Sequence, residues 1–389
     1  MLKTIRRFET VSSAPATGNK RRNQGVDVIR GLSIILVVIN HMALRIPLAR
    51  TNLASILPSR LLEAVGSSGH AAVFAFFVIS GFLITQTVLG RWKSLGGVRL
   101  AQFYALRAAR ILPCLVALVA VLALLDLMGE PDYVITRPDQ SLPRAIFAAL
   151  FMHMNWYEGH TGYLPGNWDV LWSLSIEEAF YLFFPLICLT VGKRPAIFAV
   201  LVGAFALSLP LLLDALSHEP RIWRHKAYAP GMSAIAMGVS AALLARKCPG
   251  MKSSALFHLA GWAGLCMTIL MFLADDILSA YLGAGCMLVL TTGVALLLIA
   301  FQGGWGNAVL TPWTGWVRRC GVLSYEIYLT HMFVVYTLIR VYAWSGCGLR
   351  YVWLWTALAL FVSLRLGSIV EKTFSTPARH WFGRRLIAE

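Results

Sequence analysis

Long apolar segments constrain the fold of this chain more than any other feature. Ten of them are close to the roughly 20 residues that a helix needs to cross a bilayer. Backbone polar groups inside a bilayer must be satisfied internally, so these segments are expected to be helices. They lie at 27–45, 70–90, 107–128, 169–192, 195–216, 228–245, 255–274, 278–301, 321–342 and 350–371. The sequence therefore predicts an all-α polytopic membrane protein, a bundle of about ten transmembrane helices.

The composition excludes a set of soluble domains. Of the 389 residues, 58% are hydrophobic and 13% are charged, whereas a soluble domain has about 25% charged residues. The net charge of +16 would suit a nucleic-acid-binding protein. Most Lys and Arg residues, however, lie in short loops between apolar segments, where they set membrane topology. We therefore expect the lipid bilayer as a partner and no nucleic acid.

An eleventh apolar segment, 143–157, is short and interrupted by polar residues. If it does not cross, 22 of the 34 Lys and Arg residues fall on one side of the membrane and 9 on the other. The positive-inside rule then makes the richer side cytoplasmic. We predict ten spans in the cytoplasmic membrane, both termini in the cytoplasm, and 143–157 as a re-entrant or interfacial segment.

Three regions follow from this pattern. Residues 1–26 are basic and polar and have no apolar signal-peptide core, so they are interpreted as a disordered cytoplasmic tail. Residues 27–371 form the membrane domain, and 372–389 a cytoplasmic C-terminal tail. The seven cysteines are scattered without paired spacing, which argues against a disulfide framework or a zinc site.

The first apolar segment contains Arg30 and His41. Charged and ionisable side chains within a membrane span are rare and often functional. On a helix, eleven steps place His41 about 16 Å deeper than Arg30. This spacing suits a long substrate that enters from one face and reacts deeper in the membrane. The alternative is an arginine that reaches the interface and a histidine that bonds a neighbouring helix.

Arg107 and Arg110 precede Pro113 at the cytoplasmic mouth of the third span. Their i, i+3 spacing puts them on one helix face. Guanidinium groups bind phosphates in forked geometry, so this pair could hold a phosphorylated substrate. The alternative is a topology anchor.

Ser173, Glu177 and Tyr181 repeat at i, i+4 and i+8 and form one polar stripe in the fourth span. A carboxylate in the bilayer needs a partner or a proton. Glu177 and His41 are expected at similar depths, so Glu177 could orient and polarise His41 as a general base. A purely structural ion pair is the alternative.

Ser324, Tyr328 and His331 share one helical face in the ninth span. His331 is either functional or a hydrogen-bonded packing residue. In the second span, Ser80 and Gly81 are expected to permit close helix packing.

Together and in this order, these motifs resemble the acyltransferase-3 family of integral membrane acyltransferases, from Asp27 to Arg365. The resemblance implies transfer of an acyl group, most often acetyl, from cytoplasmic acyl-CoA to a hydroxyl. It also implies an acceptor that is a carbohydrate of the cell envelope or exopolysaccharide, or a small metabolite. The family's functional motifs correspond to Arg30 with His41 and to Arg107 with Arg110.

Two departures from the family accompany the resemblance. Ala72-Val73-Phe74 stands where many members carry Gly-Val-Asp, so an acidic contribution from the second span is absent. The chain stops at Glu389, without the appended extracytoplasmic domain of some members. A separate acceptor-handling protein is therefore an open partner.

These inferences give a working mechanism. Arg30, Arg107 and Arg110 hold the phosphates of acyl-CoA, which is a donor substrate and not a permanently bound cofactor. His41, polarised by Glu177, acts as general base or accepts the acyl group transiently. The candidates for supporting or oxyanion-stabilising groups are Tyr181, Ser324, Tyr328 and His331. Asn167 and Trp168, in an external loop, are expected at the acceptor site, and no metal is expected.

The rival interpretation is a proton-coupled exporter of a polar or glycosylated compound, since such proteins also bury His, Glu and Arg. The sequence has no two-half symmetry or matched broken helices, which argues against it. A non-catalytic partner subunit for lipid or polysaccharide is a third alternative.

Overall fold

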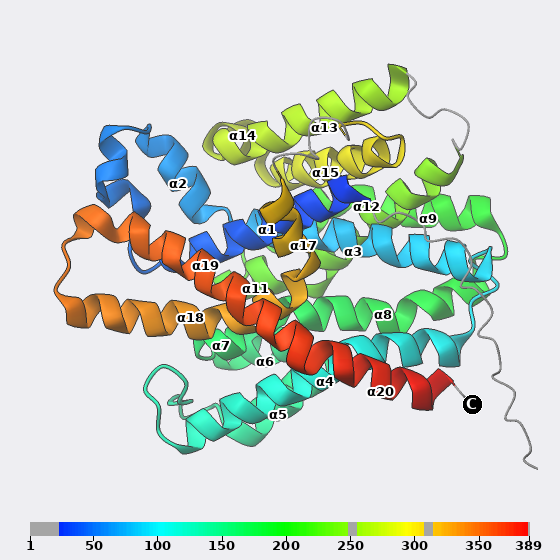
Figure 1. Cartoon of the computed structure of the whole chain (residues 1–389). Coiled ribbons are helices and arrows are strands. Elements are labelled where there is room, and N and C mark those ends of the chain that lie inside the picture. Colours follow the sequence, from blue (N-terminus) through cyan, green and yellow to red (C-terminus); the bar gives the residue numbers. More distant parts are fainter. Residues whose placement is uncertain (1–22, 248–254, 307–313, 388–389) are drawn as a thin grey trace, which may run out of the picture.

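The computed structural model is a bundle of long helices (Figure 1). It describes residues 23–247, 255–306 and 314–387. In these residues every regular element is a helix, and nine helices are long and apolar enough to cross a membrane. The bent pair α9 and α10, whose axes differ by 44°, makes a tenth. The protein is therefore an all-α, multi-pass membrane protein, as predicted.

The spanning helices follow the ten predicted segments in order. They are α1 (Gln24–Ala43), α3 (Gly69–Trp92), α4 (Leu100–Leu127), α8 (Trp172–Thr190), α9 (Pro195–Leu207) with α10 (Leu209–Ala215), α12 (Tyr228–Lys247), α13 (Ala255–Leu273), α15 (Cys286–Gln302), α18 (Ser324–Ser345) and α19 (Val352–Val370). Shorter helices connect or extend them: η1 (Leu48–Arg50), η2 (Asn52–Ser55), α2 (Ser59–Ser67), α7 (Gly166–Asp169), α11 (Arg221–Lys226), α14 (Asp275–Leu282), η3 (Gly283–Gly285), α17 (Gly315–Val322), η4 (Leu349–Tyr351), η5 (Glu371–Ser375) and α20 (Thr376–Ile387).

The interrupted segment 143–157 forms two short helices and no span. They are α5 (Leu142–Leu150) and α6 (Met154–Thr161), with nine and eight residues. Met152 between them has a φ of 61°, in the left-handed region, so the helix cannot continue through it. Neither helix has the length to cross a bilayer. This confirms the prediction of a short segment that does not span.

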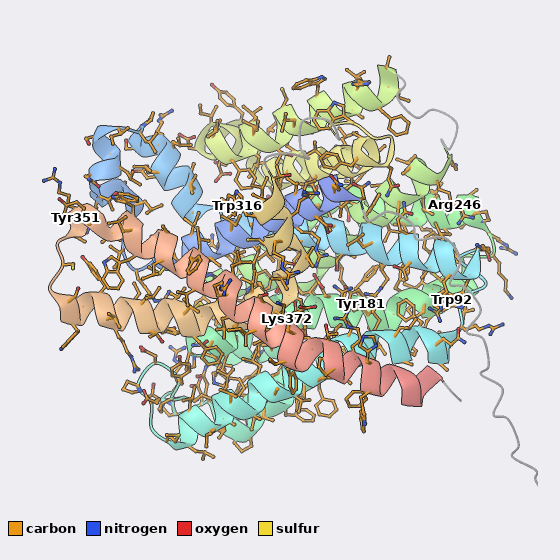
Figure 2. The ribbon with its side chains drawn as sticks, viewed as in Figure 1. Trp92, Tyr181, Arg246, Trp316, Tyr351 and Lys372 are labelled. Carbon is orange, nitrogen blue, oxygen red and sulfur yellow. The ribbon has the colours of Figure 1, made fainter. Side chains whose placement is uncertain are left out.

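The two ends of the bundle are marked in Figure 2. Trp92 and Arg246 lie at one end, called here the Trp92 end, and Tyr351 lies at the other, called the Tyr351 end. Helix α1 packs against α3, α17, α18 and α19 and carries both Arg30 and His41, about three turns apart. Its position inside the bundle brings both side chains against several other spans.

The structure describes most of the predicted C-terminal tail but little of the predicted N-terminal tail. Residues 1–22 of the N-terminal tail lie outside the described residues, and α1 begins at Gln24. The C-terminal region 372–389 is helical up to Ile387: α19 continues through one π-helical turn into α20 (Figure 1). Because α20 packs against α4, it becomes part of the bundle and not a detached tail.

Glycines allow α3 and α12 to cross at backbone contact. A Cβ built on Gly81 would lie 1.9 Å from the carbonyl oxygen of Ile235, and one on Gly238 would lie 1.8 Å from that of Val78. Small residues at such crossings let transmembrane helices approach closely. The close packing expected around Ser80 and Gly81 is therefore present.

Replacing Gly81 by alanine is expected to destabilise the bundle by about 1–3 kcal/mol, because the methyl group forces apart two backbones that cannot yield locally. Gly90→Ala on the same helix is the matched control, since a Cβ there meets nothing within 4 Å. The measurement is the unfolding of both variants in detergent. Equal stability of Gly81→Ala and wild type would contradict this packing.

Candidate active site

A cavity of about 460 Å³ lies between α1, α3, α4, α8, α18 and α20. Arg30, Arg107 and Arg110 all line it, although they come from two separate spans. Arg379 from α20 lines it as well. The structure thus brings the three predicted donor-binding residues to one site. The sequence analysis missed Arg379 because it assigned that residue to a tail.

The arginines differ in their partners. Arg30 donates to the Ser324 hydroxyl at 2.8 Å, which ties α1 to α18. Arg107 is half-buried, with its guanidinium 5.1 Å from the centre of the Tyr181 ring. In the described part of the chain, neither Arg107 nor Arg110 forms an ion pair within 4.0 Å. Their donors are therefore not committed to a protein carboxylate.

Acidic side chains line the same cavity and limit its net positive charge. They are Asp27, Glu177, Glu326 and Glu371. Glu177 accepts a hydrogen bond from the Tyr181 hydroxyl at 3.1 Å, and the Ser80 hydroxyl lies 2.6 Å from that of Tyr181. Glu177 therefore belongs to a polar network with the second span, beside the arginines.

The expected contact between Glu177 and His41 does not form. Among the described residues, the hydrogen bonds of the His41 ring go to Val37 and His331. The depth estimate placed Glu177 and His41 at similar levels, but depth alone does not fix which way each helix faces. Asp169, on α7, is an acidic side chain near His41.

His41 and His331 form a pair across α1 and α18. Nε2 of His331 lies 3.3 Å from Nδ1 of His41, and the ring centres are 4.9 Å apart. His331 is completely buried, whereas His41 is partly exposed. The two histidines that the sequence analysis singled out separately thus form one site.

Backbone carbonyls assign the proton on each ring. Nδ1 of His331 is 2.7 Å from the Tyr328 carbonyl, and Nδ1 of His41 is 2.8 Å from the Val37 carbonyl. A carbonyl only accepts, so both Nδ1 atoms donate, and Nε2 of neutral His331 can accept from His41. Nε2 of His41 then carries a lone pair, which gives this atom the character of a base or nucleophile.

Tyr328 and Ser173 stand between the cavity and the histidine pair. Both residues line the cavity, which His41 and His331 do not. The Tyr328 hydroxyl donates to the Val170 carbonyl at 2.8 Å and accepts from the Ser173 hydroxyl at 2.7 Å. The Tyr328 ring centre is 5.7 Å from that of His331. Tyr328 thus links the wall of the cavity to the histidine pair.

The predicted acceptor residues are buried inside α7. Asn167 is 2% exposed and Trp168 is 0% exposed. Both side-chain amide atoms of Asn167 and Nε1 of Trp168 are buried without a hydrogen-bond partner in the structure. Their burial differs from the open external loop in which the sequence analysis expected them.

Close to α7 lies an ionic cluster that the sequence analysis missed. Lys226 donates to Glu158 at 2.7 Å and also to Asp169. In the sequence analysis Lys226 was only one of the nine Lys and Arg residues on the side of the membrane that holds fewer of them. Its partners lie 68 and 57 residues away along the chain, and no local pattern signals such a contact.

The chain matches the family model described as an acyltransferase domain over residues 23–370, nearly the whole chain. Among curated relatives, a provisionally named O-acetyltransferase of Staphylococcus aureus strain COL is 30% identical over 201 residues, 49% of this chain and 29% of that protein. O-acetyltransferase OatA of Staphylococcus aureus strain NCTC 8325 is 30% identical over 174 residues, 42% of this chain and 24% of that protein. The matched regions thus span less than a third of these relatives. No solved structure matches the chain.

The family match includes both helices of the histidine pair and the three arginines of α1 and α4. Because it also covers nearly the whole membrane bundle, this chain belongs to the acyltransferase-3 family.

Proposed function

We propose that this protein is a membrane O-acyltransferase that moves an acyl group, expected to be acetyl, from acyl-CoA to a hydroxyl. The proposal rests mainly on one observation: Arg30, Arg107 and Arg110 line the same cavity. Tyr328 also lines this cavity and lies next to the histidine pair, in which Nε2 of His41 carries a lone pair. The family match and relatives named as O-acetyltransferases support it. The proposed acceptor is a carbohydrate of the cell envelope or exopolysaccharide, or a small metabolite.

The arginines suit the phosphates of coenzyme A. A guanidinium offers several N–H donors in a plane and binds phosphate oxygens in pairs. Arg107 and Arg110 keep these donors unpaired with carboxylates in the described chain, and Arg379 adds a further cation. Since acyl-CoA is cytoplasmic, this assignment puts the Trp92 end and both termini in the cytoplasm, with the protein in the cytoplasmic membrane.

The chemistry at His41 is a proton transfer coupled to acyl transfer. Nε2 of His41 takes the proton of the acceptor hydroxyl as its oxygen attacks the thioester carbon. The carbon–sulfur bond then breaks, the proton passes to the departing thiolate, and an ester and free coenzyme A remain. A positioned general base contributes about 10²–10⁴ in rate. An acyl-histidine at the same Nε2 is the alternative route, and acid-quench trapping of labelled protein separates the two.

The function is tested with purified protein in lipid and acetyl-CoA labelled in the acetyl group. Release of the label, or its transfer to an added cell-envelope or small-molecule extract, is expected to depend on the protein. Failure to turn over or bind acetyl-CoA would contradict the proposal and favour an exporter, for which substrate flux is the next assay.

Tyr328→Phe is expected to lower kcat by about 10²-fold with little change in the KM for acetyl-CoA. The Tyr328 hydroxyl donates to the Val170 carbonyl in this structure; in the reaction its proton would turn from that carbonyl to the oxyanion, and such a donor is worth about 10²–10³ in rate. Tyr336→Phe is the matched control on the same helix, because Tyr336 donates no bond to the histidine pair and accepts from the Gly166 amide. An unchanged kcat in Tyr328→Phe would remove Tyr328 from the reaction.

A further inference from the structure

The buried ionic cluster of Glu158, Asp169 and Lys226, called here the Lys226 cluster, is not used by the function proposed above. Lys226 is 5% exposed and Glu158 is 0% exposed. Glu158 accepts from Lys226 and from the Leu164 amide at 3.1 Å, while Asp169 accepts from Lys226. Placing three ionisable groups in a nonpolar interior costs free energy unless they are mutually paired. We therefore ask what function could justify the cost of burying this cluster.

The cluster is connected to the histidine pair through α7 and α18, which pack together. The Tyr328 hydroxyl donates to the carbonyl of Val170, the residue after Asp169. The carbonyl of the same Tyr328 accepts from His331, and His331 contacts His41. Tyr328 therefore holds both the backbone next to Asp169 and the ring of His331, which contacts His41.

The charges that face His41 come from three places. They are Asp169 on α7, Arg45 just after α1 and Lys226 on α11. Glu158 bonds Lys226 and the Leu164 amide and, among the described residues, forms no hydrogen bond with α1 or α18. Arg45 donates to the His41 carbonyl at 2.9 Å and is partly exposed, so water screens its charge. His331 on α18 contacts the His41 ring itself.

We propose that the Lys226 cluster positions a negative charge for His41. Asp169 stabilises the imidazolium that forms when His41 takes the acceptor's proton. Lys226, anchored by Glu158, holds Asp169 in place. This inference rests on the proposed acyl transfer, and it assigns to Asp169 the role that the sequence analysis gave to Glu177. Asp169 and Lys226 are positioning residues, since neither needs to touch a substrate.

The cluster itself offers a matched pair of variants. Asp169→Asn removes the charge that acts on His41 and leaves Lys226 paired with Glu158. Glu158→Gln removes an equal charge from the same lysine but leaves Asp169. We expect Asp169→Asn to lower kcat about tenfold at unchanged KM for acetyl-CoA. Glu158→Gln should stay within about threefold of wild type, because Glu158 bonds Lys226 and the Leu164 amide and not the segment that bonds Tyr328.

A second measurement does not need turnover. Diethylpyrocarbonate modifies neutral imidazole, so the pH dependence of His41 modification, read by mass spectrometry of its peptide, reports when the ring loses its proton. A nearby negative charge favours the protonated ring. In Asp169→Asn the half-point should therefore move to lower pH by about one unit, whereas Glu158→Gln should keep the wild-type half-point.

The outcomes separate the two proposals. If wild type turns over acetyl-CoA and both variants lose activity and stability equally, with the half-point unmoved, the cluster is structural and this inference is wrong. If wild type has no transferase activity, the proposed function fails, whatever the half-points are. A shifted half-point in Asp169→Asn alone, together with the fall in kcat, supports the assignment.

Discussion

Replacing His41 by alanine is expected to lower the rate of acyl transfer by about 10²–10⁴-fold while the helix bundle remains folded. With Nδ1 donating to the Val37 carbonyl, Nε2 of His41 carries a lone pair, and the residue is partly exposed. The His41 ring bonds only its own helix and His331 among the described residues, so its loss should leave the helix contacts in place. The measurement is label transfer at saturating acetyl-CoA.

Two controls belong with this variant. His258→Ala removes an exposed histidine from α13 and should leave transfer unchanged. His331→Ala removes one of the two acceptors of the His41 Nδ1 proton, leaves the Val37 carbonyl and retains Nε2, so it should keep more activity than His41→Ala. Substantial transfer by a folded His41→Ala protein would exclude His41 as base and as acyl carrier.

The double variant Arg107→Ala and Arg110→Ala is expected to raise the KM for acetyl-CoA by about 10–100-fold. A hydrogen bond to a charged group contributes about 1.5–3 kcal/mol, and two guanidiniums are removed from one cavity wall. At saturating donor, kcat should fall much less, because neither arginine lies at His41. The measurement is initial rate against acetyl-CoA concentration.

The double variant Arg91→Ala and Arg99→Ala is the control that tests whether the loss of net positive charge alone raises KM. Both residues are exposed, belong to the same basic end and do not line the cavity. Removing them changes the net charge by the same amount but should leave KM near the wild-type value. If both pairs raise KM equally, the arginines act through general attraction of an anion, and the cavity is not the donor site.

Much of the donor side could be predicted from the sequence. Apolar length fixed the spans, and the i, i+3 spacing placed Arg107 and Arg110 on one face near the end of α4. Gly81 predicted a close helix crossing because only a residue without a side chain allows backbones to touch. These features depend on local sequence, so they can be predicted without knowledge of the tertiary structure.

The reaction centre could be predicted only in part. His41 and His331 were each identified, but their contact depends on how α1 and α18 are rotated toward each other. The same uncertainty led to the expected pairing of Glu177 with His41, whereas the structure turns Glu177 to Tyr181. The contacts of Lys226 with Glu158 and Asp169 could not be predicted from the sequence, because α6, α7 and α11 come together only in the folded protein.

The most direct test of the account is a structure of the protein in lipid with a thioether analogue of acetyl-CoA that cannot transfer its acyl group. The account predicts the phosphates of the analogue at Arg30, Arg107 and Arg110, and its carbonyl carbon beyond Tyr328, within reach of Nε2 of His41. An analogue bound at the Tyr351 end, or bound in the arginine-lined cavity with its carbonyl directed away from His41, would contradict it.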